Sequence, residues 1–212
     1  MAGVKDYGQF CALARALDQI GDRWTLLVVR ELLLGPATYS QLQRALPGVA
    51  TNLLADRLRD MAADGIVERE VPGGARSAYL LTSRGSDLRP VVHALVRWGG
   101  PLMGAGPAGD VVDERWLGLA LEALLTTSAY DGELGRARVR CGGVTVDVVA
   151  AGRSRRVEWV RDESQGDPGA PDVAVTGSLP DVLAAAYRGR LPAGLRVKGS
   201  RRLARTLLSS AP

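Results

Sequence analysis

The sequence predicts an α+β protein made of two domains of similar size. Its 212 residues allow one large domain or two small ones, each with a core of its own. Seven glycines and prolines crowd residues 99–109, a density that the interior of a regular helix or strand does not accept. Helical periodicity and period-two alternation occur on both sides of this stretch. We therefore expect domains at residues 1–99 and 112–212, joined by a Gly/Pro-rich linker at 100–111.

The composition argues against several classes of protein. The longest apolar run, residues 24–34, is interrupted by Arg30 and Glu31, so we expect no membrane span and no membrane partner. Two distant cysteines, Cys11 and Cys141, predict neither a disulfide framework nor a structural zinc site. A single histidine, His93, leaves little room for histidine-based catalysis, and we predict neither an enzyme nor a bound cofactor. No secretory signal precedes the first charged helix, so a cytoplasmic location is expected.

The net charge of +4 is spread evenly between the two halves. Residues 1–108 hold 12 Lys and Arg against 10 Asp and Glu, and residues 109–212 hold 15 against 13. Since neither half is a basic tail, an interaction with nucleic acid must depend on where individual cations lie.

The first domain is expected to begin with four helices. Residues 12–20 and 24–33 follow a helical pattern, and the second of these is so apolar that most of it must be buried. Thr38 followed by Gln41 has the spacing of a capping box and opens a short helix. After a turn at Pro47-Gly48, a helix is predicted at 51–63, with its apolar side chains inward: Leu54, Leu58 and Met61.

A hairpin and a last helix complete this domain. Residues 66–71 and 77–81 are predicted strands around a turn at 72–75, and Thr82 is expected to cap a helix that runs through Trp98. This order of elements is that of a winged helix-turn-helix. In such a domain the second short helix enters the major groove of DNA while the hairpin lies along the backbone.

Polar side chains are expected on the DNA-facing surface of this domain. Asparagine can bond adenine, and arginine can bond guanine or phosphate, while amides at a helix start can contact phosphate. The candidates are Thr38, Tyr39, Ser40, Thr51, Asn52, Arg57, Arg59 and, in the hairpin turn, Arg76. The alternative is that Asn52 only starts a helix and that the arginines pair with Asp56 and Asp60 on a solvated surface.

Several ordered motifs of residues 8–99 resemble those of HxlR-type transcription regulators. The stretch 11–35 resembles the start of these proteins, and the same spacing continues at residues 39–42, 54–58, 64–67, 79–82 and 90–98. The resemblance implies a homodimer whose first and last helices form the dimer surface and whose recognition helices read half-sites one helical turn apart. Ala50 departs from the family, which usually has a serine-like cap there, and Thr51 is expected to take over that cap.

Cys11 falls where many members of that family carry a cysteine, which some use to sense oxidants. A sensing role would require an accessible thiol with a low pKa. The alternative, which we favour, is a small buried hydrophobe against the dimer helix.

The second domain is predicted to combine strands and helices. A helix is expected at 112–127, a hairpin at 136–141 and 144–148, a further strand at 156–160, and a loop at 162–171. The C-terminal part then repeats one unit twice: a strand, a glycine turn, a serine cap and a helix.

This layout resembles the sterol-carrier-protein fold over residues 112–210. The resemblance implies a hydrophobic tunnel between the sheet and the helices that cover it, suited to a flat apolar ligand. The candidate lining residues are Trp116, Leu121, Trp159, Leu183 and Tyr187. Each of them is also explained as an ordinary core residue.

We therefore expect a homodimeric transcription regulator, a repressor that binds a pseudo-palindromic operator in double-stranded DNA. Its second domain would bind an apolar small-molecule effector that changes DNA affinity through linkage. Two alternatives stay open: a redox-sensing regulator that uses Cys11, and an apolar-ligand carrier protein with no DNA role.

Overall fold

The computed structural model describes residues 6–70, 77–103, 106–126, 130–160 and 170–210, and the chain divides into two compact units. We call residues 1–92 unit 1 and residues 93–212 unit 2. The sequence predicted the division at the Gly/Pro-rich stretch, whereas the units divide within the helix α6 (Arg89–Gly99). The second part of α6 belongs to unit 2 because it is bonded there: the Tyr187 hydroxyl donates to the Val96 carbonyl (2.9 Å), and the Arg97 guanidinium donates to the Ala123 carbonyl (3.0 Å).

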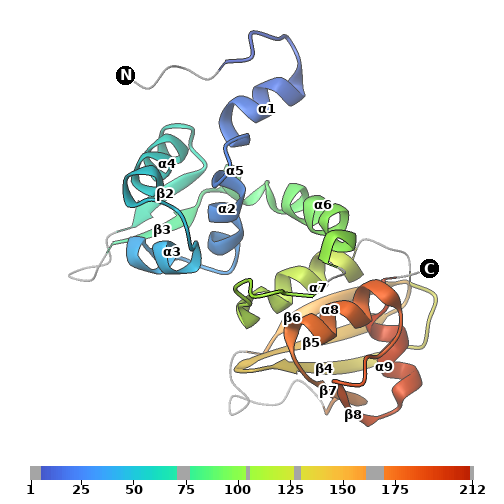
Figure 1. The fold of residues 1–212 in the computed structure, drawn as a ribbon. Coiled ribbons are helices and arrows are strands. Elements are labelled where there is room, and N and C mark those ends of the chain that lie inside the picture. Colours follow the sequence, from blue (N-terminus) through green and yellow to red (C-terminus); the bar gives the residue numbers. More distant parts are fainter. Residues whose placement is uncertain (1–5, 71–76, 104–105, 127–129, 161–169, 211–212) are drawn as a thin grey trace. The chain divides into compact units, whose positions relative to one another are not determined.

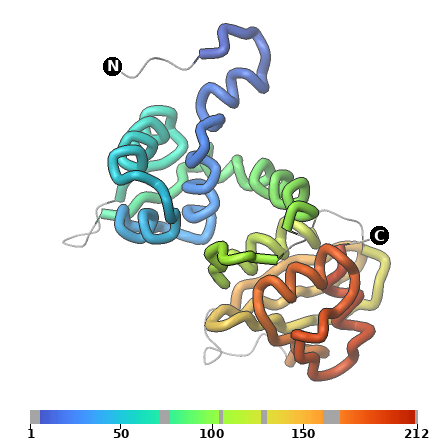
Figure 2. The backbone as a smooth tube through the Cα atoms, viewed as in Figure 1, coloured from blue at the N-terminus to red at the C-terminus, as the bar shows by residue number. Residues whose placement is uncertain are grey.

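Unit 1 has the element order predicted for a winged helix-turn-helix (Figures 1 and 2). Its helices are α1 (Ala12–Ile20), α2 (Thr25–Leu33), α3 (Tyr39–Ala45), α4 (Thr51–Ala63), α5 (Ser83–Ser86) and the start of α6. The strands β2 (Val67–Glu70) and β3 (Ala78–Leu81) form the antiparallel hairpin, and β1 (Ala37–Thr38), which the sequence did not predict, pairs with β3. The hairpin turn at 71–76 lies outside the described residues.

Two predicted details of unit 1 are wrong. One helix was predicted from Thr82 through Trp98, but α5 ends at Ser86 and α6 begins separately at Arg89. Pro90 accounts for the break, because proline fits the first turn of a helix and cannot donate a bond to a preceding one. Thr51 does not cap α4: the N-cap is Ala50, whose side chain makes no cap bond.

Unit 2 is a five-stranded sheet covered on one face by helices (Figure 1). Its strands are β4 (Gly135–Cys141), β5 (Val144–Ala151), β6 (Ser154–Trp159), β7 (Val173–Thr176) and β8 (Arg196–Gly199), in the spatial order β6-β5-β4-β7-β8. Neighbours are antiparallel except β4 and β7, which are parallel. The predicted helix at 112–127 is shorter, with α7 (Leu117–Leu125) following a single 3₁₀ turn at Glu114–Trp116.

The core of unit 2 lies between the sheet and the helices α7, α8 (Leu179–Arg188) and α9 (Arg201–Leu208). Alternate residues of the central strands point into it, including Val139, Val146, Val148 and Val175. The intervening residues of β4 and β5 carry charge on the opposite face, where Arg138 lies across from Asp147. The predicted loop at 162–171 lies largely outside the described residues.

Candidate nucleic-acid interface

The helix-turn-helix of unit 1 starts from a complete capping box at α3. Thr38 is the N-cap: its hydroxyl accepts from the Gln41 amide (3.3 Å), and its own amide donates to the Gln41 side-chain carbonyl (2.7 Å). The prediction from the Thr38–Gln41 spacing is confirmed. Thr38 and Gln41 therefore bond to each other at the start of α3. Ser40, in the first turn, is exposed and its side chain is not part of this capping box.

Two side chains of α3 hold the N-terminus of α4. The Tyr39 hydroxyl donates to the Thr51 carbonyl (2.7 Å), and the Gln43 amide donates to the Thr51 hydroxyl (2.8 Å). Gly48 allows the tight turn between the helices with a φ of +86°, a conformation that favours glycine. The inner side of α4 is buried through Leu54, Leu58 and Met61, so its opposite side is presented outward.

The outward side of α4 carries Asn52, Asp56 and Arg59. These positions follow helical spacing and all three side chains are exposed. Arg59 forms an ion pair with Asp56, one turn away on the same helix. An exposed pair of this kind is weak, so a phosphate or a guanine edge can compete for the guanidinium.

Arg57 lies away from this outward side. Only 12% of its side chain is exposed, and its guanidinium forms ion pairs with Asp22, which precedes α2, and with Asp60 (3.4 Å). Arg57, predicted to contact DNA, therefore lies between α4 and the start of α2, where its ion pairs hold the two together. We expect Arg57 to act on DNA binding by positioning α4.

Two further cations lie near the predicted interface and were missed by the sequence interpretation. Arg44 is exposed on α3 and its guanidinium donates to the Ser40 carbonyl (3.2 Å). Arg69 is exposed on the wing strand β2, where it donates to the Ser77 hydroxyl (2.7 Å). Arg44 could have been found from its position one turn after Ser40. Arg76, the predicted wing contact, lies outside the described residues.

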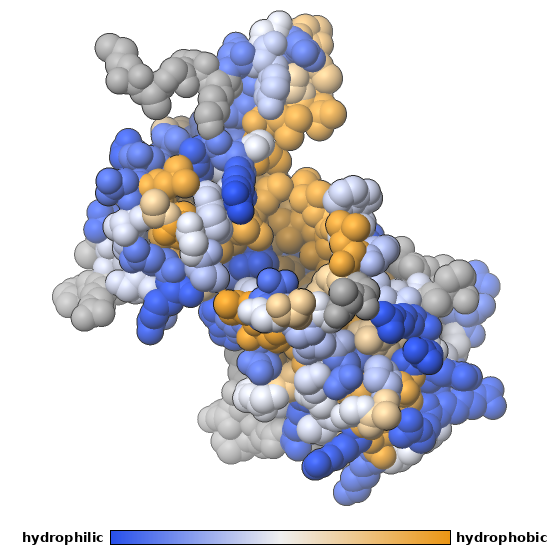
Figure 3. All heavy atoms as spheres, viewed as in Figure 1, coloured by the Kyte–Doolittle hydropathy of each residue, from blue (hydrophilic) through white to orange (hydrophobic). Residues whose placement is uncertain are grey.

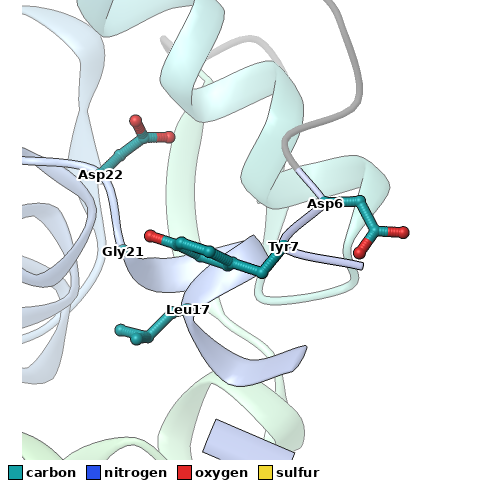
Figure 4. Close-up of a pocket in the computed structure, with 5 residues that line it drawn as sticks. All are labelled: Asp6, Tyr7, Leu17, Gly21 and Asp22. Atoms are coloured by element: carbon teal, nitrogen blue, oxygen red, sulfur yellow. The ribbon is translucent and has the colours of Figure 1, made fainter. Parts of the chain in front are cut away.

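A shallow hollow of about 310 Å³ lies beside α1 in unit 1 (Figure 4). It is lined by Asp6, Tyr7, Leu17, Gly21 and Asp22. The Tyr7 ring extends across Leu17 toward Gly21, and the Asp6 carboxylate is directed away from the ring, where it pairs with Arg15. Gly8 and Arg15 hold the pKa of Asp6 below its ordinary value through hydrogen bonds.

The two cysteines have different surroundings. Cys11 is exposed immediately before α1 in the single chain, and its burial against the helix of a second copy stays a prediction. Cys141 is buried in the core of unit 2, and burial raises the pKa of its thiol to about 11. A thiol in that environment stays protonated and unreactive near neutral pH.

The five candidate effector residues fall into three different environments. Leu121 and Leu183 belong to the packed core of unit 2. Tyr187 is bonded to α6, and burial raises the pKa of its hydroxyl. Trp116 is partly buried, and Trp159 on the edge strand β6 is 40% exposed, with its ring lying against Gly118 of α7.

The described residues contain no group of three or more His, Cys, Asp or Glu that could hold a metal ion. Among the helices of the described chain, none is long and apolar enough to cross a membrane.

A capped helix-turn-helix, a paired wing and a polar outward face on the second helix define a DNA-binding transcription regulator of the winged-helix type. Residues 19–105 match the family described as HxlR-like helix-turn-helix. The chain belongs to this family.

Two relatives that are transcriptional regulators agree with that assignment. A helix-turn-helix-type transcriptional regulator of Synechocystis is 38% identical over 96 residues, which span 43% of this chain and 70% of the relative. The regulator YvaP of Bacillus subtilis is 33% identical over 86 residues, spanning 40% and 80%. A solved structure of a protein described as a MarR-family transcriptional regulator of Enterococcus faecalis is 35% identical, covering 44% of this chain and 86% of that chain, with a TM-score of 0.39.

Proposed function

We propose that the protein is a homodimeric repressor whose α4 helices read the two halves of a pseudo-palindromic operator. The observation that carries this proposal is the orientation of α4: its inner side is buried, while Asn52 and Arg59 are exposed on its outer side. The Tyr39 and Gln43 bonds to Thr51 hold the start of the helix in place. In helix-turn-helix proteins that end of the second helix contacts the base edges.

Replacing Asn52 with alanine is expected to weaken operator binding by about ten- to a hundredfold, because a lost bidentate base contact is worth about 1–3 kcal/mol. Affinity for unrelated duplex DNA should change little. The measurement is a gel shift at fixed salt with the DNA upstream of the protein's own gene. Ser86→Ala, at an exposed position of α5, is the control.

Equal affinities of Asn52→Ala and the control for the operator would remove α4 from the base-reading role. If the unchanged protein showed no sequence preference at all, the alternative of an apolar-ligand carrier without a DNA role would be favoured.

The homodimer part of the proposal is supported by apolar side chains exposed on α1. Phe10, just before the helix, and Leu13 and Leu17 within it are all exposed, and Figure 3 shows hydrophobic side chains gathered over this helix at the top of the view. Monomeric proteins rarely expose several large apolar side chains together, and a second copy of the chain would cover them. Exposed Leu95 and Trp98 give α6 the same character.

Replacing Leu13 with glutamate is expected to weaken the dimer by about ten- to a hundredfold, because burying a charged group at an interface costs about 1–3 kcal/mol or more. Leu13 is 67% exposed within one chain, so the fold itself should be unaffected. Light scattering over a dilution series measures the change. Leu134→Glu is a matched control, since Leu134 is 60% exposed but lies outside α1. Unchanged dissociation of Leu13→Glu would assign the dimer surface elsewhere.

The effector part of the proposal is supported by Trp116 and Trp159 of unit 2. Trp116 precedes α7 and is partly buried against the core, while the Trp159 ring on the edge strand β6 lies against Gly118 of α7 and is 40% exposed. A partly exposed indole beside a helix offers a flat apolar surface to a small molecule. An effector bound there would change the affinity of the protein for its operator. By linkage, operator DNA would change the affinity for the effector by the same factor.

A further inference from the structure

The basic character of the whole chain resides in its last 31 residues. Residues 182–212 contain seven Lys and Arg and no Asp or Glu, while residues 1–181 contain 20 Lys and Arg against 23 Asp and Glu. The net charge of the second half does not reveal this segment, because the acidic residues of 109–181 offset its positive charge. Without its C-terminal part, the chain would carry a net negative charge, which opposes approach to DNA.

The structure places five of these cations in one consecutive stretch at the edge of the unit 2 sheet. Arg196 and Lys198 lie on the edge strand β8, and Arg201, Arg202 and Arg205 lie on α9, which follows it directly. We call these five residues the basic edge. All five are exposed, and Figure 3 shows hydrophilic side chains gathered at the lower right of the view, where α9 lies.

The basic edge is not neutralised by the described part of unit 2. None of the described carboxylates forms an ion pair with any of its five side chains. This differs from other exposed arginines of the same unit, such as Arg115 with Asp113 and Arg156 with Glu158. Five like charges within ten residues repel one another, so an anionic partner would be bound with relief of that repulsion.

The chemistry of the basic edge favours the phosphates of duplex DNA over other polyanions. Four of the five residues are arginines, whose planar guanidinium matches phosphate geometry. Residues 188–210 contain no aromatic side chain on which the bases of a single strand could stack. The apolar side of α9, with Leu203, Leu207 and Leu208, is buried in the core and therefore cannot enter a lipid bilayer.

We propose that the basic edge of unit 2 is a second DNA-binding surface, which contacts the phosphate backbone without reading sequence. This inference rests on the proposed function, because α4 brings the chain to DNA. The basic edge then adds affinity that depends on salt and is indifferent to base sequence.

The test uses the full-length protein and a duplex of unrelated sequence, with affinity measured over a range of salt concentrations. Arg201→Gln/Arg202→Gln/Arg205→Gln is expected to reduce the slope of log affinity against log salt by about 2 to 3, since each lost phosphate contact removes about 0.9. The control Arg115→Gln/Arg153→Gln/Arg156→Gln removes the same charge from other exposed positions of unit 2 and should leave the slope near that of the unchanged protein. If the α9 variant fails to fold, Arg196→Gln/Lys198→Gln tests the same surface, with an expected reduction of about 2.

Equal slopes for the basic-edge variant and its control would overturn the inference. The inference would also be overturned if the basic-edge variant lost binding to phosphatidylglycerol vesicles or to polyglutamate while its binding to DNA was unchanged. The partner of the basic edge would then be a membrane or an acidic protein. Operator binding that still depends on Asn52 shows that the proposed function stands when the inference fails. Absence of binding to any duplex would overturn both.

Discussion

Replacing Asp147 with asparagine is expected to destabilise unit 2 by about 3–5 kcal/mol, the cost of breaking a buried ion pair by removing one of its members. Asp147 is completely buried on the charged face of the sheet. One of its carboxylate oxygens accepts from Arg138 Nε (2.9 Å), and the other accepts from Arg138 Nη2 (3.0 Å) and Arg136 Nη1 (2.9 Å). Asparagine would keep one acceptor and turn an amide donor toward the buried Arg138 guanidinium.

Urea unfolding followed by hydrogen exchange of residues 135–151 measures this change in the correct unit, since two units need not unfold together. Asp131→Asn is the control because Asp131 is an exposed carboxylate of the same unit. A change below about 1 kcal/mol in the free energy of unfolding would show that the cluster relaxes or admits water, contrary to its burial in the structure.

The same carboxylate makes unit 2 sensitive to acid. Burial alone would raise the pKa of Asp147, but the hydrogen bonds from Arg138 and Arg136 hold it below its ordinary value of 3.8. A group with a lowered folded-state pKa contributes stability above its unfolded pKa and loses it as the pH falls through the folded pKa. The contribution of Asp147 is therefore complete near neutral pH and is lost only below about pH 4. In Asp147→Asn this part of the acid dependence should be absent.

Periodicity and caps predicted much of the fold because they are local signals. The bounds of α1 and α4 agree with the predicted ranges 12–20 and 51–63, and the Thr38 capping box is present. The break between α5 and α6 was missed because the helix with the apolar side chains Leu88, Val92 and Leu95 was extended back to the Thr82 cap, although Pro90 was a visible signal.

The candidate site depended more on contacts between distant residues. Asn52 and Arg59 are found outward on α4 from helical spacing alone. Arg57 shares the same helix, but its pairing with Asp22 links positions 35 residues apart, and no local pattern reveals it. The alternation of Arg136, Arg138 and Arg140 likewise predicts a solvated strand face. Only the register of β4 with β5 places Asp147 opposite Arg138 and turns that face into a buried ion cluster.

Replacing Arg155 with methionine is expected to destabilise unit 2 by about 2–4 kcal/mol. Arg155, on β6, is only 5% exposed, and none of the described carboxylates pairs with it. Its Nη1 donates instead to the backbone carbonyls of Leu207 (3.2 Å) and Ser209 (2.5 Å), at the end of α9. Methionine fills a similar volume but removes the donor to the buried Leu207 carbonyl, at about 1–3 kcal/mol for a buried group left unsatisfied.

The charge of Arg155 adds to this loss. A cation at a helix C-terminus is favoured by the helix dipole, by up to about 2 kcal/mol where it is partly buried. The guanidinium also lies over the Tyr130 ring, 4.8 Å from its centre, which adds a further cation–π attraction. Burial lowers the pKa of Arg155, yet an arginine keeps its charge at any pH where the protein folds.

Two variants separate these contributions in urea unfolding. Arg155→Lys retains the charge but has no planar fork to span two carbonyls, so it should lose less stability than Arg155→Met and more than the control. Arg153→Met is the control, because Arg153 is exposed two residues earlier in the same hairpin. If Arg155→Met were as stable as Arg153→Met, the end of α9 would not depend on the hydrogen bonds from Arg155.

The same change should also affect DNA binding, because α9 carries Arg201, Arg202 and Arg205. Arg155 holds α9 in place and with it the surface proposed to contact DNA. Arg155→Met is therefore expected to weaken binding to unrelated duplexes when α9 is released.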